Sequence, residues 1–139
     1  MLKKNINNLI VQDVIIQPDN FPVVNEEELL RETIEKMNNF KLGIACIVNS
    51  ENILLAVITD GDIRRILLSE QKPIASLFVD DVIDHASLNF KYVKPTTLLK
   101  DAISIMGNDK VWDLPVIDEK GFLIGLLHLH PAIKKVFEI

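Results

Sequence analysis

The sequence has little cysteine, and it has no long apolar run. Cys46 is the only cysteine among 139 residues, and it stands inside the apolar run 43–48. A lone cysteine in such a run indicates a small buried side chain in a reducing compartment rather than a nucleophile. No apolar run approaches the ~20 residues that a membrane-spanning helix needs, so we expect no membrane segment. Five glycines and six prolines exclude collagen-like and low-complexity chains.

The chain also lacks an excess of positive charge and an N-terminal targeting pattern. It has 15 Lys and Arg against 20 Asp and Glu, a net charge of −5, which argues against nucleic acid as a partner. Residues 1–8 contain two lysines but no apolar stretch and no cleavage pattern, so we expect no signal peptide and a cytoplasmic location. Hydrophobic residues make up 48% of the chain, and they must be buried in a core or in an interface.

What the chain does contain is an internal repeat. A shift of 69 residues brings Val24 onto Val93 and Leu54 onto Leu123, without a gap from residue 20 to beyond residue 127. The shift also superimposes the helical stripe Leu29, Leu30, Ile34 and Met37 on Leu98, Leu99, Ile103 and Met106. An apolar pattern that stays in phase for so long indicates two copies of one structural unit.

Each copy predicts the element order β-α-β-β-α, which is an α/β (α+β) fold. In the first copy we expect a strand at 21–24, a helix at 26–39, strands at 44–48 and 53–58, and a helix from residue 63. In the second copy we expect a helix at 97–107, strands at 114–117 and 122–127, and a helix from residue 131. Strands this apolar need cover on both faces, so we expect the two copies to pack sheet to sheet around a shared core. The predicted ranges are an arm at 1–9, repeats at 10–70 and 80–139, and a linker at 71–79.

Two stretches carry a resemblance to a known family. The segment Val57–Arg65, with its Thr-Asp-Gly-Asp turn, and the segment Leu114–Gly121 resemble a CBS domain. Over residues 10 to 137 the chain resembles a tandem CBS pair, also called a Bateman module. It is similar to the pairs attached to arabinose 5-phosphate isomerase-type sugar isomerases and to sugar nucleotidyltransferases, either of which is therefore a candidate partner enzyme.

The resemblance implies a regulatory module and not an enzyme. CBS pairs bind adenosine nucleotides such as AMP, ADP or ATP in clefts between the repeats, form homodimers, and pass the binding event to a partner. No catalytic residue, metal site or required cofactor is predicted, because the chain has no glycine-rich phosphate loop and no nucleophile motif. The alternative is a module that binds no ligand and only dimerises or docks, and it rests on the terminal apolar residues Leu2, Ile6, Phe137 and Ile139.

The resemblance places the ligand at the turn of the first repeat. Thr59 and Asp62 are the expected contacts, with Asp60 and Gly61 between them. A carboxylate at Asp62 can accept two hydrogen bonds from a ribose diol, and the Thr59 hydroxyl with the helix-start N–H groups can hold a phosphate. The alternative is that Asp60 or Asp62 only caps the helix, while Arg65 pairs with Asp62 one turn later.

By the same resemblance the second repeat completes this site with Lys91, Val111, Trp112 and Asp113. A base could stack on Trp112, or the indole could instead plug the cleft or pack in a dimer interface. A carboxylate at Asp113 favours a base amino group and disfavours a nearby phosphate.

The second copy of the turn departs from the pattern. His128-Leu129-His130-Pro131 stands in place of Thr59–Asp62, and Pro131 takes the ribose-carboxylate position. We expect the second cleft to be empty or weak. The two histidines, spaced as alternate residues at a strand end, should face the same way, but they are too few to hold a metal.

Overall fold

The chain forms two compact units in the computed structural model, which describes residues 5–138. One unit is residues 18–90, and the other combines residues 91–138 with the N-terminal segment up to Gln17. Leu2 and Ile139, two of the apolar residues that suggest a docking module, lie outside the described residues. No helix in residues 5–138 is long and apolar enough to cross a membrane.

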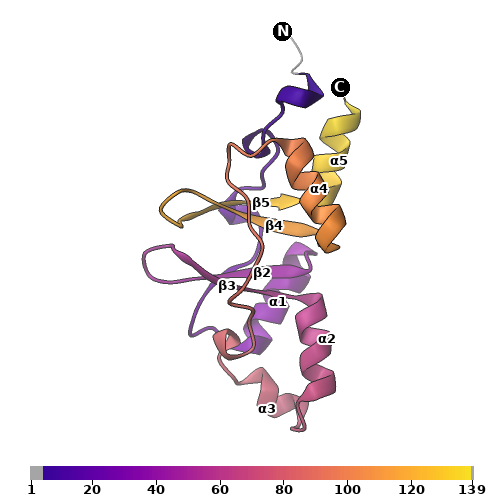
Figure 1. The fold of residues 1–139 in the computed structure, drawn as a ribbon. Helices are drawn as coiled ribbons and strands as arrows, with labels where there is room; N and C mark the ends of the chain where they lie inside the picture. The colour runs from indigo at the N-terminus through magenta and orange to yellow at the C-terminus, as the bar shows by residue number, and fades with distance from the viewer. Residues whose placement is uncertain (1–4, 139) are drawn as a thin grey trace. The chain divides into compact units, whose positions relative to one another are not determined.

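The unit of residues 18–90 is a three-stranded sheet with helices. Strands β1 (Val23–Asn25), β2 (Ile44–Val48) and β3 (Leu54–Thr59) lie in that order, β1 parallel and β3 antiparallel to β2. Helices α1 (Leu30–Phe40), α2 (Asp60–Ser69) and α3 (Ile74–Phe78) complete the unit (Figure 1). The buried core consists of Val24, Leu30, Met37, Ala45, Ile47, Ala56, Ile58, Ile66, Leu77 and Val82.

The other unit repeats this plan. Strands β4 (Asp113–Ile117) and β5 (Leu123–His128) pair antiparallel, and helices α4 (Leu99–Asp109) and α5 (Leu129–Phe137) lie beside each other (Figure 1). In place of β1, Val93 makes a single parallel bridge to Val116. The buried core consists of Leu9, Val11, Val93, Leu99, Ala102, Met106, Leu114, Val116, Leu127 and Ala132.

The structure confirms the repeat and the predicted mixed fold element by element. The shift of 69 residues carries the bounds of α1, β2 and β3 onto those of α4, β4 and β5. It also carries Lys41, the left-handed residue that ends α1, onto Lys110, the left-handed residue that ends α4. Equivalent helices therefore end by the same backbone device, with a hydrogen bond from the left-handed residue back into the last turn.

Each unit includes a short segment that precedes the other repeat in the sequence. The backbone of Ile16 pairs with Leu126 of β5, and Leu99 at the start of α4 donates to the Leu9 carbonyl. Ser87 pairs in the same way with Val57 of β3, and Leu30 donates to the Asp80 carbonyl. Residues 10–17 therefore belong to the same compact unit as residues 91–138, whereas the sequence range predicted for the first repeat begins at residue 10.

The predicted starts of four helices, residues 26, 63, 97 and 131, were wrong, because the helices begin at Leu30, Asp60, Leu99 and Leu129. Helix α1 begins at Leu30 and not at residue 26, because the Asn25 side chain accepts a hydrogen bond from the Glu27 N–H and holds a turn there. The short helix α3 lies within residues 71–79, the range predicted as a linker. Helix α5 begins at Leu129, so Pro131 is its third residue, where the missing proline N–H costs no intrahelical hydrogen bond.

Candidate functional site

The Thr-Asp-Gly-Asp turn lies where β3 ends and α2 begins, and it is closed by a reciprocal capping box. The Thr59 hydroxyl accepts the Asp62 N–H at 3.2 Å, and Asp62 Oδ2 accepts the Thr59 N–H at 3.0 Å. The Thr59 hydroxyl also donates to the same Oδ2 at 3.0 Å. Such a box satisfies two N–H groups at the helix start, and it holds the Asp62 carboxylate in one orientation.

The other oxygen of Asp62 carries an ion pair. Arg65 Nη2 lies 2.9 Å from Asp62 Oδ1, one turn further along α2. The Arg65 guanidinium lies over Gly61, where a Cβ added to the glycine would be 3.2 Å from Nη2. The capping and pairing arrangement weighed as the alternative to a ligand site is thus present in the ligand-free chain. A ligand that uses the Asp62 carboxylate must share or replace these contacts.

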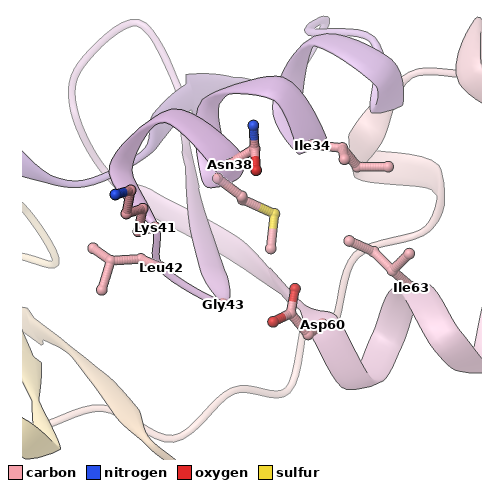
Figure 2. A pocket seen from close by; sticks show the side chains of 8 residues that line it. Ile34, Asn38, Lys41, Leu42, Gly43, Asp60 and Ile63 are labelled. Atoms are coloured by element: carbon pink, nitrogen blue, oxygen red, sulfur yellow. The ribbon is translucent and has the colours of Figure 1, made fainter.

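Asp60, the residue after Thr59, lines a pocket inside the same unit. The pocket has a volume of about 330 Å³, and Figure 2 shows the Asp60 carboxylate at its edge, near Gly43. A Cβ on Gly43 would lie 2.7 Å from Asp60 Oδ2, so a larger residue at position 43 would require the Asp60 carboxylate to shift. The remaining walls come from α1, the loop after it, and α2: Ile34, Met37, Asn38, Lys41, Leu42 and Ile63.

The four predicted residues of the second repeat lie in the other unit, and their surroundings differ. Trp112 is 61% exposed, and Lys91 is also exposed. Val111 packs against the core of its unit and donates its N–H to the Met106 carbonyl, so it serves the end of α4. Asp113 is partly buried at the start of β4.

Asp113 belongs to a cluster with two histidines and Trp112. His128 Nδ1 lies 2.7 Å from Asp113 Oδ1, across the antiparallel register of β4 and β5. The His130 ring stands edge to face with both His128, at 5.0 Å between centroids, and Trp112, at 5.8 Å. The two imidazoles are adjacent because the chain turns into α5 after His128, and not because the two residues alternate along a strand. In residues 5–138 no group of three or more ligand-type side chains could hold a metal ion.

Position by position, the second repeat replaces the polar turn of the first with bulkier groups. Under the shift of 69 residues, Trp112 stands for Gly43 and Pro131 stands for Asp62. The backbone contact survives the change, since Asp60 donates to the Gly43 carbonyl and Leu129 donates to the Trp112 carbonyl in the same way. The fold of the turn is therefore kept, while its two carboxylates are lost and the large Trp112 side chain takes the place of Gly43.

Sequence reasoning missed the Asp113–His128 pair and the pocket. The pair was within reach of the sequence, because the predicted hairpin of residues 114–127 places the residues just beyond its ends opposite each other. The pocket was not, because its walls come from residues of α1, of the loop after it and of α2, which are up to about 30 positions apart in the sequence.

Comparison with known proteins bears on this site. The sequence profile of the family described as CBS domain matches residues 11–69 and 79–130. The arabinose 5-phosphate isomerase KdsD of Escherichia coli is 25% identical over 126 residues, which are 91% of this chain and 37% of the isomerase. The chain thus spans about a third of the length of the curated relatives that it matches.

Two solved structures share the fold. The structure of CBSX2 in complex with AMP has a TM-score of 0.81 and 24% identity, covering 94% of this chain and 97% of that one. The CBS domain pair of protein MJ0100 from a complex with 5′-methylthioadenosine and S-adenosylmethionine has a TM-score of 0.76 and 16% identity, covering 93% and 95%.

Proposed function

Because the chain belongs to the CBS domain family and carries two copies of the domain, we propose that it is a regulatory module that binds one adenosine nucleotide at the Thr59–Asp62 turn. AMP, ADP and ATP are the candidate ligands. The observation that carries the proposal is the Asp62 carboxylate, held by Thr59 at the start of α2, in a unit where the neighbouring Asp60 borders an open pocket. The ligands of the two related structures, AMP in one and methylthioadenosine with S-adenosylmethionine in the other, support an adenosine group.

The ribose is the part of the ligand that Asp62 suits best. A carboxylate has about four acceptor sites, and a vicinal diol can donate two hydrogen bonds to it. Gly61 and Gly43 present no side chain of their own beside the turn, and the groups next to them are the Arg65 guanidinium and the Asp60 carboxylate, so a ligand that approaches this backbone must move those two groups. We assign Thr59, Asp60, Gly61 and Asp62 to the ribose and phosphate end of the nucleotide.

We extend the proposal to the second repeat with Lys91, Val111, Trp112 and Asp113. The exposed indole of Trp112 suits a base, since stacking on an aromatic ring contributes about 1–3 kcal/mol per base. Lys91 supplies an exposed positive charge for a phosphate. Val111 would contribute backbone groups. Asp113 could accept a hydrogen bond from a base amino group only at acceptor sites that His128, bonded to its Oδ1, does not occupy.

The module's output is regulatory in this proposal, not catalytic. Binding would shift the population of the module's conformations, and a partner protein would respond to that shift. A sugar-phosphate isomerase or a sugar nucleotidyltransferase is the proposed partner, because KdsD carries a segment similar to nearly all of this chain. A cytoplasmic location fits a ligand of this kind.

Equivalent exposed apolar residues support a homodimer, and they also support the second candidate function, a ligand-free docking module. Leu68 near the end of α2 is 82% exposed, and Phe137, its equivalent at the end of α5, is 84% exposed. Apolar side chains left in water at the same position of both repeats suit a partner surface. We propose that a second copy of this chain covers them.

A thermal melt against AMP, ADP and ATP tests nucleotide binding. A ligand at 100 times its dissociation constant adds about 2.7 kcal/mol to the free energy of unfolding, which raises the Tm of a chain of this length by roughly 8–13 °C. We expect Asp62→Ala to lose this shift relative to its own ligand-free melt. Asp101→Ala is the matched control, because Asp101 is the third residue of α4 as Asp62 is of α2. If no nucleotide shifts the wild-type melt, the proposal is wrong and the docking module takes its place.

A further inference from the structure

The Asp62 carboxylate is already heavily used in the ligand-free chain. Oδ2 accepts two hydrogen bonds from Thr59, through the backbone N–H and the hydroxyl. Oδ1 accepts Arg65 Nη2 at 2.9 Å. Of about four acceptor sites on a carboxylate, three are therefore occupied. The two contacts with Thr59 are part of the capping box that starts α2, so they are the costly ones to break.

A ribose diol needs two acceptor sites, and one remains. The contact that can yield is the one with Arg65, because the guanidinium is on the surface and its side chain is 64% exposed. A diol bound to Asp62 therefore displaces Arg65 from Oδ1. The displaced guanidinium keeps its charge and stays near the first turn of α2, since it lies over Gly61 one helical turn from its own Cα.

We propose that Arg65 makes this site select nucleoside phosphates over free nucleosides, an inference that rests on the proposed function. A nucleoside breaks the Arg65–Asp62 pair and offers the guanidinium nothing in return. A nucleotide breaks the same pair, and its phosphate gives the guanidinium a new anionic partner with a matching bidentate geometry. The Arg65–Asp62 ion pair thus opposes the binding of nucleoside and nucleotide equally. Only the phosphate of the nucleotide offsets the loss of that ion pair.

Besides Lys91, which belongs to the other unit, two cations near the turn could bind the phosphate instead. Arg64 is the neighbour of Arg65 on α2, but it is exposed, and it forms no ion pair within residues 5–138. Lys41 lines the pocket beside Asp60. Neither of them competes with the ribose for Asp62. Their removal would therefore weaken the binding of AMP without strengthening the binding of adenosine. This difference separates Arg65 from a cation that only adds charge.

Titration calorimetry with AMP and with adenosine tests the inference on the whole chain, since the two probes differ only in the 5′-phosphate. In Arg65→Ala we expect AMP to bind about tenfold more weakly, as a charged hydrogen bond is lost, and adenosine to bind about two- to fivefold more tightly, as a surface ion pair is removed. Arg65→Lys should keep part of the preference for AMP. Arg64→Ala and Lys41→Ala are the controls, and neither should strengthen adenosine binding.

The outcomes are distinguishable. If Arg65→Ala weakens AMP binding and also strengthens adenosine binding, the inference stands. If the wild type binds AMP but Arg65→Ala leaves the AMP-to-adenosine ratio unchanged, the inference is wrong and the proposed function survives. If the wild type binds neither probe nor any other adenosine nucleotide, the proposed function and the inference fall together.

Discussion

His128 and Asp113 form a polar contact between two strands of the second repeat, whereas Thr59, the equivalent of His128, bonds to Asp62 within its own turn. His128 occupies the position of Thr59, and its Nδ1 lies 2.7 Å from Asp113 Oδ1 on the opposite strand. The first repeat joins its turn to its own helix, whereas the second joins its turn to the neighbouring strand. The two repeats thus keep one backbone while their side chains bond in different directions, and only the first leaves a carboxylate at the helix start.

This pair should stabilise the second repeat. The Asp113 side chain is 7% exposed, so removing His128 leaves a nearly buried carboxylate with fewer partners. We expect Asp113→Ala and His128→Ala each to lower the free energy of unfolding by about 1–3 kcal/mol. In a double-mutant cycle by urea denaturation the two changes should couple by about 1 kcal/mol. Additive effects would show that the two side chains do not interact in solution.

The capping box should contribute to stability even without a ligand. Thr59→Ala removes the side-chain acceptor for the Asp62 N–H and a donor to its carboxylate. We expect a loss of about 1 kcal/mol in the free energy of unfolding. Thr59→Ser keeps the hydroxyl, so it should retain most of the wild-type value. Equal losses for alanine and serine would mean that the methyl group, and not the cap, is responsible.

Substitution by alanine should have opposite effects on stability at Gly125 and at Gly107. A Cβ on Gly125 in β5 would lie 2.9 Å from Ile15 Cδ1 and 3.0 Å from the Ile16 carbonyl oxygen, whereas a Cβ on Gly107 in α4 would meet nothing within 4 Å. We expect Gly125→Ala to destabilise the chain by about 1–3 kcal/mol through overpacking. Gly107→Ala should stabilise it by about 0.5–1 kcal/mol, because alanine is the better helix former. A neutral Gly125→Ala would contradict the packing of residues 10–17 against β5.

Asp80 should make the chain sensitive to acid. Lys72 Nζ at 2.7 Å and His85 Nε2 at 2.8 Å bond its Oδ2, and these contacts, the lysine's first, lower the pKa of the carboxyl group below its ordinary 3.8. A carboxyl group whose pKa is lower in the folded state stabilises the fold fully above pH 3.8 and stops doing so as the pH falls through the folded pKa. We therefore expect Asp80→Asn to lower Tm at about pH 5, with the difference from wild type disappearing below the folded pKa. A difference in Tm that does not change over this range would rule out the carboxylate as its source.

The exposed apolar residues predict the assembly state. We expect Leu68→Asp and Phe137→Asp to convert a dimer to a monomer in light scattering, because each places a charge in a surface that a partner would dehydrate. Neither should unfold the single chain, since both side chains are exposed within it, so the far-UV circular dichroism spectrum should stay that of the wild type. Leu88→Asp is the control, an exposed leucine outside both helices. A wild-type chain that is monomeric at high concentration would remove the basis for the homodimer.

A good part of the fold was predictable, because it depends on patterns within short stretches. The continuous apolar run of residues 44–48 and the repeat at a shift of 69 residues predicted β2 and its equivalent β4 to within one residue. The Thr59–Asp62 cap and its ion pair with Arg65 could be foreseen as one of two alternatives, because both contacts span three residues of one helix start. The start of α1 could not be predicted, because Asn25 holds a turn at residues 26–28, where three glutamates would favour the start of a helix.

The sequence by itself determined the repeat, the strands and the polar turn, because local propensity and periodicity act between residues close in the chain. Only the tertiary structure decided that residues 10–17 pack on β5 and that a pocket lies beside Asp60. These contacts join segments far apart in sequence, and they form only where the burial of a whole core outweighs the entropy of bringing those segments together.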